Sequence, residues 1–364
     1  MMWWVASIAL GLALVQLAVA LANLLSRPWL PRRLAETEPL VSVLIPARNE
    51  AANIGNLLGD LSRLPHRNLE ILVFDDLSDD DTAAIVEEAA SGDPRIRLLR
   101  SPGLPDGWTG KNFGCHTLAA AARGDYFLFL DADVRVSGDL VGNAVAAARR
   151  LQTGLISLFP EQVMVTQGEK WAVPGMNYIL VTVLPLMLVL LSRRPSLAAA
   201  NGQMMFFDAA IYRSLQPHSS VREIRVEDIT IARMLKKKGV RVACLLGDER
   251  IRCRMYHGYQ EAVRGFSRSV TAFFGNSFLV AFLFWLLTTF GFLPILLTMG
   301  IPMMILWFIL SVATRFIVAR ASCQKVSLYL AGFPMHQLSM GMFIFKAFCN
   351  RMNKEFEWKG RRVS

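Results

Sequence analysis

The feature that most constrains this sequence is residues 125–136, DYFLFLDADVRV, in which an apolar run ends at a pair of aspartates. The run that begins at Tyr126 is short and aromatic, which predicts a buried strand. Asp131 and Asp133 follow it and are separated by the small residue Ala132. Residues two apart in an extended chain point to the same side, so both carboxylates can face one divalent cation. The alternative is a strand that runs into a solvated turn, where aspartate is common.

Short strands and helices alternate from about residue 40 onward. We expect strands at 40–46, 68–76, 96–101, 125–134, 154–159 and 240–246, helices at 47–64, 114–122, 139–151, from 78 and from 227, and loop and helix at 197–212. This alternation predicts an α/β fold whose mostly parallel sheet carries helices on both faces. Ligands bind such sheets at the carboxyl ends of the strands, where the pairs Asp75–Asp76 and Asp131–Asp133 are expected to lie.

Residues 1–25 are apolar throughout and long enough to cross a hydrocarbon core of about 30 Å. No basic residue precedes this stretch, whereas Arg27, Arg32 and Arg33 follow it. The positive-inside rule therefore predicts a membrane anchor over residues 1–26, after which the chain continues on the cytoplasmic side. A cleaved signal peptide is the alternative, but such a peptide normally begins with a basic segment.

The last quarter of the chain is apolar again, and the mean hydropathy of the whole sequence is +0.37. Over residues 272–364 we expect two membrane spans, near 276–298 and 302–319, then a re-entrant or interfacial segment at 326–348 and a basic tail. Residues 171–192 are also apolar, but a single crossing there would place the strands that follow on the far side of the membrane. We therefore expect helices that lie in the membrane interface.

Charge and cysteine content restrict the partners and the kinds of site. The net charge is +10, and basic residues stand beside the apolar segments, which suits an anionic membrane surface better than nucleic acid. The five cysteines are scattered without a CxxC pair, so neither a disulfide framework nor a zinc site is expected. These features predict a multi-pass protein of the plasma (inner) membrane whose domain at residues 40–270 faces the cytoplasm.

Two motifs near the expected strand ends suit a nucleotide. Asp75 and Asp76 end a strand, where a carboxylate can accept the imide N–H of a uracil or hold a ribose, or else cap the next helix. In DGWTGKNFG (106–114) the glycines allow close approach to a diphosphate, and Lys111 offers it a point charge.

Charged residues also mark two expected helix starts. IPARNE (45–50) ends a strand and opens a helix, where free N–H groups suit an anionic or polar ligand, although ordinary capping gives the same pattern. Glu227 and Asp228 open a later helix, where carboxylates also simply favour the helix dipole. The functional interpretation makes Asp228 a general base that removes a proton from an attacking hydroxyl.

As an ordered set, these motifs resemble the nucleotide-sugar-binding domain of family 2 glycosyltransferases over residues 40–270. The resemblance implies a GT-A fold, a UDP-sugar donor, Mg²⁺ or Mn²⁺ on the DxD pair, and inversion at the anomeric carbon by single displacement. It implies a catalytic base at Asp228 and a metal on Asp131 and Asp133. The donor-site residues that it implies are Pro46, Ala47, Glu50, Asp75, Asp76, Lys111, Asp131, Ala132, Asp133, Gly202 and Gln203.

Three further stretches are similar to membrane-bound transferases that glycosylate carotenoid or hopanoid-type lipids. They are WTGKNFGC (108–115), Arg254-Met255-Tyr256, and the tail motif EWKGR (357–361). The similarity implies a lipid acceptor of the terpenoid class that enters from the bilayer. Transfer to polyprenyl phosphate, diacylglycerol or ceramide is an alternative, and an inactive membrane scaffold is an alternative of another class.

The sequence departs from the family pattern at two places. The usual DDGS is DDLS here, so Leu77 replaces the glycine of a turn. The Arg-Trp pair of polysaccharide synthases is replaced near Arg264-Gly265-Phe266, which makes processive polymer synthesis less expected. Arg264 and Arg268 are left as candidate phosphate contacts.

Overall fold

The computed structural model describes residues 1–26, 28–32, 37–353, 357–358 and 361–362. Several residues used above lie outside the described residues: Arg27 and Arg33 at the anchor boundary, and Lys359 and Gly360 of the tail motif.

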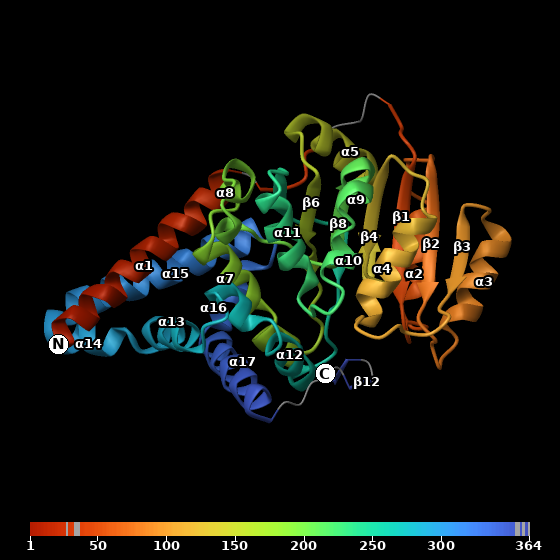
Figure 1. Ribbon diagram of the computed structural model, residues 1–364. Coiled ribbons are helices and arrows are strands. Elements are labelled where there is room, and N and C mark those ends of the chain that lie inside the picture. Colours follow the sequence, from red (N-terminus) through yellow and green to blue (C-terminus); the bar gives the residue numbers. More distant parts are fainter. Residues whose placement is uncertain (27, 33–36, 354–356, 359–360, 363–364) are drawn as a thin grey trace.

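A seven-stranded sheet forms the centre of the domain that follows the N-terminal helix (Figure 1). Its strand order is β3-β2-β1-β4-β8-β6-β9. The strands are β1 (Val41–Ala47), β2 (Leu69–Asp75), β3 (Ile96–Arg100), β4 (Tyr126–Leu130), β6 (Leu155–Phe159), β8 (Met204–Asp208) and β9 (Val242–Leu246). Neighbours are parallel except at β8, which runs antiparallel to both β4 and β6. The sheet is therefore mostly parallel, and the predicted α/β fold is confirmed.

Helices cover both faces of this sheet with separate cores. One core joins the strands to α2 (Ile54–Ser62), α3 (Thr82–Gly92) and α5 (Leu140–Leu151). The other joins the alternate strand residues to α4 (Gly110–Ala121), α9 (Ala209–Leu215) and α11 (Glu227–Lys237), and continues into the membrane-like helices. Beside the large sheet, β5 (Val134–Val136), β10 (Ile251–Cys253) and β7 (Glu161–Gln162) form a small sheet.

Strand β8 corrects the sequence interpretation, which expects loop and helix over residues 197–212. The strand lies between β4 and β6, and four of its five residues are buried. A central strand with a core on each face is apolar on both sides, and periodicity cannot distinguish such a short apolar run from a buried helix. The alanines on either side of MMFFD favoured the helix.

The helix expected at 47–64 is also shorter than predicted, because α2 begins only at Ile54. Residues 48–53 form a loop whose backbone N–H groups are taken by the next strand–helix connection. The N–H of Glu50 donates to Thr82 Oγ1 (2.8 Å), and that of Ala51 donates to Asp80 Oδ2 (3.0 Å). The IPARNE segment therefore does not present the free N–H groups of a helix start.

Two helices are long and apolar enough to cross a membrane: α1 (Met2–Leu25) and α15 (Ile301–Ala321). A third candidate is the pair α13 (Phe278–Phe290) and α14 (Phe292–Met299), which are bent by 56° at Gly291. In Figure 1 these helices extend as one arm from the sheet domain, with α1 and α15 side by side. These helices lie where the sequence analysis expects the anchor and the two later spans, and the bend falls within the span expected near 276–298. That they cross a membrane stays a prediction.

The N-terminal helix is fastened to the sheet domain by buried polar contacts. Asn23 donates to the carbonyls of Val181 (2.8 Å) and Leu184 (2.9 Å), and its Oδ1 accepts from the Leu186 N–H (2.7 Å). Just beyond α1, the Trp29 indole donates to the carbonyl of Ala321 (2.9 Å). The N-terminal helix α1 is thus joined to the rest of the protein by specific hydrogen bonds as well as by apolar packing.

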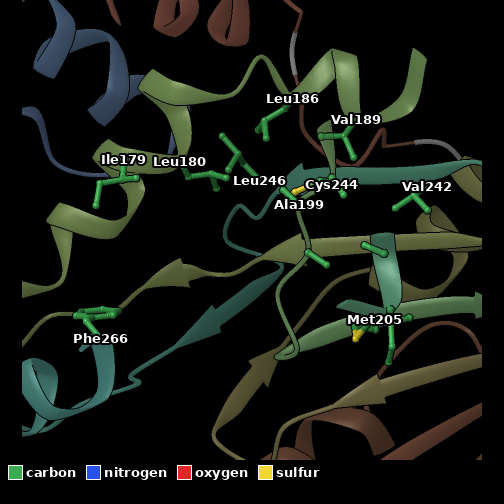
Figure 2. Packing of buried hydrophobic residues seen from close by; sticks show 14 of the residues in the cluster. Ile179, Leu180, Leu186, Val189, Ala199, Met205, Val242, Cys244, Leu246 and Phe266 are labelled. Atoms are coloured by element: carbon green, nitrogen blue, oxygen red, sulfur yellow. The ribbon is translucent and has the colours of Figure 1, made fainter. Parts of the chain in front are cut away.

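The apolar stretch 171–192 forms short helices with breaks at its prolines. These are α6 (Gln167–Ala172), α7 (Pro174–Val183) and α8 (Leu186–Leu191). Figure 2 shows Leu186 and Val189 of α8 beside Val242 and Cys244 of the edge strand β9. The remaining helices are α10 (Pro217–Ser220), α12 (Tyr259–Phe266), α16 (Val326–Ala331) and α17 (Phe333–Asn353), and the described part of the tail pairs β11 (Glu357–Trp358) with β12 (Arg361–Arg362).

Candidate active site

The DxD pair lies directly after the central strand β4, as the sequence predicts. The N–H of Asp131 donates to the carbonyl of Gln203 (3.2 Å), and the Val134 N–H donates back to the Asp131 carbonyl (3.3 Å). The segment is therefore a turn, where the sequence interpretation assumed an extended chain. The two carboxylates still lie close together, but Asp131 contacts Lys111, while Asp133 borders a cavity.

The Asp133 carboxyl has the properties expected of a carboxylate that binds a cation. Burial, with the neighbouring charges of Asp131 and Glu50, raises the pKa of Asp133 to about 7. Its Oδ1 is buried and accepts no hydrogen bond from the described residues. A carboxylate oxygen that is buried beside other carboxylates gains most from a cation.

The residues present fit a Mg²⁺ or Mn²⁺ ion that is completed by its substrate. The described residues contain no group of three or more His, Cys, Asp or Glu side chains that could hold a metal. Magnesium, however, commonly binds one or two protein carboxylates together with substrate phosphates and water. Asp133, with Asp131 beside it, supplies this smaller set.

A cavity of about 600 Å³ opens at Asp133. It runs between α2 and the small sheet, and its lining includes Arg135, Arg252, Arg254 and His257. Spacing in the sequence gave no reason to assign His257, because the fold alone brings it near Asp133. Arg264 and Arg268, the candidate phosphate contacts, are exposed on or just after α12 and are not among the described residues that line this cavity.

Lys111 joins the DxD pair to the start of α11. Its Nζ lies 2.8 Å from Asp131 Oδ1 and 3.1 Å from Glu227 Oε1. Burial alone would lower the pKa of Lys111, but these two carboxylates raise it well above its usual value. The ammonium is thus permanently charged, and two protein carboxylates already hold it.

Asp228 follows Glu227 in the first turn of α11, which begins at Glu227 as predicted, so it lies beside the Lys111 ion pairs. Its Oδ2 accepts from the Gly202 N–H (3.0 Å), and its Oδ1 accepts from the Ile229 N–H (2.7 Å). Burial and the adjacent charge of Glu227 raise the pKa of Asp228 to about 7. A carboxyl with a pKa near neutrality is suited to accept a proton.

Gly202 lies just before β8 and directly against the ion-paired cluster, so a side chain there would displace the ends of Lys111 and Glu227. A Cβ atom at this position would lie 2.9 Å from Lys111 Nζ and 3.0 Å from Glu227 Oε1. Its neighbour Gln203 donates from Nε2 to Cys253 Sγ (2.8 Å). Gly202 and Gln203 therefore lie within the cluster that the sequence analysis assigns to the donor site.

The other expected donor residues meet at the ends of β1 and β2. Ala47 pairs in register with Asp75, and Pro46 precedes it at the strand end. The Asp76 N–H donates to the carbonyl of Ala47 (2.9 Å). Asp75 is buried, and its Oδ1 accepts no hydrogen bond from the described residues. This oxygen can accept a hydrogen bond from a ligand.

The turn after Asp76 keeps a glycine-like shape without glycine. Leu77 has a φ of +53°, in the left-handed region that side chains disfavour. The guanidinium of Arg48 donates to the carbonyls of Asp76 and Leu77 and holds this conformation. The DDLS motif therefore raises the conformational energy of this turn, while the Arg48 hydrogen bonds maintain its backbone conformation.

The DGWTGKNFG motif has a partly structural role. A Cβ at Gly114 would lie 2.8 Å from the Phe74 ring, so this glycine lets α4 pack against β2. Asn112 is fully buried and donates to the carbonyls of Val221 (2.9 Å) and Ile224 (2.9 Å). The motif fixes the loop before α11 and thereby places Glu227 opposite Lys111.

Comparison with known proteins identifies the domain that carries this site. The family described as "Glycosyl transferase family 2" matches residues 42–213. Among curated proteins, the chain is 26% identical over 240 residues to the 4,4'-diaponeurosporenoate glycosyltransferase of Staphylococcus haemolyticus, covering 65% of this chain and 62% of that one. It is 28% identical over 158 residues to the beta-monoglucosyldiacylglycerol synthase of Trichormus variabilis, covering 43% of this chain and 33% of that one. The chain thus spans less than two thirds of the length of these relatives.

A solved structure supports the fold over nearly the whole length. The mannosyltransferase of Pyrobaculum calidifontis, solved in complex with GDP-Man and Mn2+, superimposes with a TM-score of 0.55 and 17% sequence identity. The match covers 95% of this chain and 99% of the other. The arrangement of the helices and the sheet is therefore that of a GT-A glycosyltransferase.

Proposed function

Because the chain belongs to glycosyl transferase family 2 over residues 42–213, we propose that it is an inverting transferase that moves a hexose from a UDP-sugar to a membrane lipid. The acceptor that we favour is a carotenoid or another terpenoid lipid. Similarity to glycosyltransferases whose names specify diaponeurosporenoate and diacylglycerol supports a lipid acceptor.

The observation that carries the proposal is the single cluster formed by Asp131, Lys111, Glu227 and Gly202, with Asp133 and Asp228 on either side. Carboxylates for a metal and a carboxyl suited to act as a base thus lie within one network. A scaffold without catalytic activity would have no use for two neighbouring carboxyls whose pKa values are raised.

The donor would bind along the carboxyl edge of the sheet. Asp75 Oδ1 has no hydrogen-bond donor among the described residues, so it suits the imide N–H of uracil. Pro46, Ala47, Glu50 and Asp76 would border the nucleoside. A divalent cation on Asp133 and Asp131, when bound, stabilises the negative charge that develops on the departing diphosphate.

Asp228 would take the proton from the attacking hydroxyl of the acceptor. The N–H groups of Gly202 and Ile229 hold its carboxylate in place, so the basic oxygen has a fixed direction. If the acceptor is itself a carboxylate, Asp228 would only orient it. Attack from the side opposite the diphosphate gives a β-glycoside.

The acceptor would arrive from the bilayer along the apolar helices. The outer faces of α1, α13 and α15 expose large apolar side chains, among them Trp4, Leu279 and Ile309. We propose that these helices and the interfacial α7 and α8 hold the transferase domain at the cytoplasmic face of the plasma (inner) membrane.

A transfer assay tests the proposal. Purified full-length protein in detergent is given UDP-glucose, UDP-galactose, UDP-N-acetylglucosamine or GDP-mannose with a carotenoid acid, diacylglycerol or polyprenyl phosphate, in Mn²⁺ or EDTA. Mass spectrometry should find a glycosylated lipid only with a UDP-sugar and Mn²⁺. D133N should abolish the product, whereas E88Q, which removes an exposed carboxylate on α3, should not. Absence of metal-dependent transfer to every lipid would refute the function.

A further inference from the structure

A buried arginine lies in the membrane-like part of the protein, away from the carboxylate cluster. Arg315 on α15 is only 3% exposed. Its guanidinium packs 3.5 Å from the centre of the Phe333 ring and 4.7 Å from that of Tyr178. Its Nη1 donates to the carbonyl of Ser311 (2.9 Å), and within the described part of the chain it forms no ion pair with a carboxylate. The positive charge therefore has no carboxylate counter-charge among the residues that the structure describes.

The guanidinium borders a small cavity that other polar groups also face. The cavity measures about 10 Å³, room for one water-sized group, and lies between α7, α15, α16 and α17. Tyr329, Gly175, His336, Gln337 and Met340 complete the lining with Tyr178. Tyr329 is 1% exposed, and its hydroxyl has no hydrogen-bond partner among the described residues.

Two hydrogen-bond donors face this cavity. The Tyr329 hydroxyl has no partner among the described residues, whereas Arg315 already donates to the Ser311 carbonyl and is hydrogen-bonded to Tyr178. A guanidinium carries five N–H groups and no acceptor, and a tyrosine hydroxyl can donate one proton. Water would satisfy the hydrogen bonds, but it would leave the buried charge uncompensated. An oxyanion satisfies both, because its oxygen accepts hydrogen bonds and its charge opposes that of Arg315.

We propose that this cavity binds one oxygen of the carboxylate or phosphate group of an anionic amphiphile from the bilayer. The residues next to Arg315, Tyr329 and Gln337 in the chain are large and apolar, and they face outward: Phe316 (48% exposed), Leu330 (37%) and Leu338 (53%). Exposed apolar side chains thus surround the site. In a bilayer, the anionic group that reaches such a site is attached to a lipid chain.

The depth of Arg315 along α15 fits the head-group level of such a lipid. Arg315 precedes the last residue of the helix, Ala321, by six positions, or about 9 Å of helix. The Ala321 carbonyl accepts from the indole of Trp29, which bridges to Leu246 on the edge strand β9. Arg315 therefore lies about two turns of α15 from the end of that helix that contacts the sheet domain.

Helix α6 separates this site from the cavity at Asp133. His336 Nε2 lies 3.0 Å from the carbonyl of Lys170 on α6. The preceding residue, Glu169, pairs with Arg254 (2.9 Å), which lines the cavity at Asp133. A lipid held at Arg315 would thus lie one helix away from the cavity at Asp133.

Binding of a single-chain amphiphile tests the site without any sugar transfer. Purified full-length protein in a neutral detergent is titrated with dodecyl phosphate, dodecanoate, inorganic phosphate or neutral dodecanol. Bound ligand is counted by native mass spectrometry, and Kd is obtained from the shift of the thermal midpoint. We expect one bound dodecyl phosphate or dodecanoate and at least a hundredfold weaker binding of inorganic phosphate and dodecanol.

Variants assign the binding to this cavity. R315Q should weaken dodecyl phosphate binding at least tenfold, and R320Q, which removes an exposed arginine from the same helix, should change it less than twofold. If R315Q does not fold, Y329F, which removes only the hydroxyl, should still weaken binding about fivefold.

Unchanged binding in both R315Q and Y329F would overturn the site. Equal binding of inorganic phosphate would assign the cavity to a soluble anion and overturn the lipid ligand. Because no transfer is measured, neither result depends on the proposed transferase activity.

Discussion

The ammonium of Lys111 lies between two carboxylates, 2.8 Å from Asp131 Oδ1 and 3.1 Å from Glu227 Oε1. Through this one side chain, the turn after β4 is joined to the first residue of α11. Asp131 belongs to the proposed metal site, and Glu227 adjoins the proposed base Asp228. Lys111 therefore fixes the position of the two halves of the site relative to each other.

Replacing Lys111 by methionine should damage both stability and activity. The two carboxylates would then repel each other, because their shared counter-charge is lost. We expect a loss of about 2 kcal/mol in unfolding free energy and a fall of about a hundredfold in kcat/KM. Urea unfolding and the transfer assay measure these effects. The matched variant K237M, in an exposed lysine at the end of α11, should resemble the wild type. An unchanged kcat/KM in K111M would show that the link has no role in the reaction.

The rate of transfer to a hydroxyl acceptor should fall as the pH is lowered through about 7. Asp228 accepts a proton only when it is ionised, and burial together with Glu227 raises its pKa to about 7. Lys111 from α4 opposes this shift, and the buried Cys244 thiol of β9, whose own pKa is raised, stays neutral in this range. A profile of kcat/KM from pH 5 to 9 checks the expectation.

D228N should lose at least 99% of the rate, or about 2.7 kcal/mol of transition-state stabilisation. Retention of most of the rate in D228N would refute the assignment of the base.

Replacing Leu77 by glycine should stabilise the protein. Leu77 has a φ of +53° and is 47% exposed, so its side chain strains the turn and buries little apolar surface. Relief of the left-handed strain is worth about 1 kcal/mol, partly offset by the greater freedom of glycine in the unfolded chain. We expect a rise of a few degrees in Tm or less, measured by scanning fluorimetry. L104G, at another exposed leucine in a loop, is the control and should not raise Tm. A lower Tm in L77G would mean that the leucine side chain has a packing role.

Replacing Asn23 by alanine should loosen the N-terminal helix from the rest of the protein. The buried Asn23 side chain would lose its three hydrogen bonds to the backbone of Val181, Leu184 and Leu186. Hydrogen bonds of this kind within membranes contribute about 0.6 kcal/mol each, which gives a loss of about 2 kcal/mol. The thermal midpoint in detergent should drop, and proteases should cut sooner near residue 184. L21A, on an exposed position of the same helix, is the matched control. Equal midpoints for N23A and L21A would show that these bonds do not fasten the anchor.

Sequence alone determined the α/β class, most strands and the residues at their ends. Hydrophobic runs of strand length bounded by polar turns specify β1, β2, β4, β6 and β9, because burial on both faces of a parallel sheet requires them. Strand β8 was not predicted, since its short apolar run stands between alanines, and such a run cannot be distinguished from a buried helix by periodicity. The predicted start of α2 was also wrong, because the hydrogen bonds that the Glu50 and Ala51 N–H groups donate to Thr82 and Asp80 outweigh the local helix preference of residues 48–53.

Only the tertiary structure decided how the motif residues combine. The spacing of Asp131 and Asp133 pointed to a shared cation, yet it could not reveal that Lys111 and Glu227 hold the first carboxylate while the second borders a cavity. The contacts of Arg315, His257 and Asn23 were equally hidden. These contacts join residues that lie far apart in the chain, and their partners are selected by the packing of whole helices and strands. Local sequence records propensity and periodicity, whereas such pairings arise only once the elements are assembled.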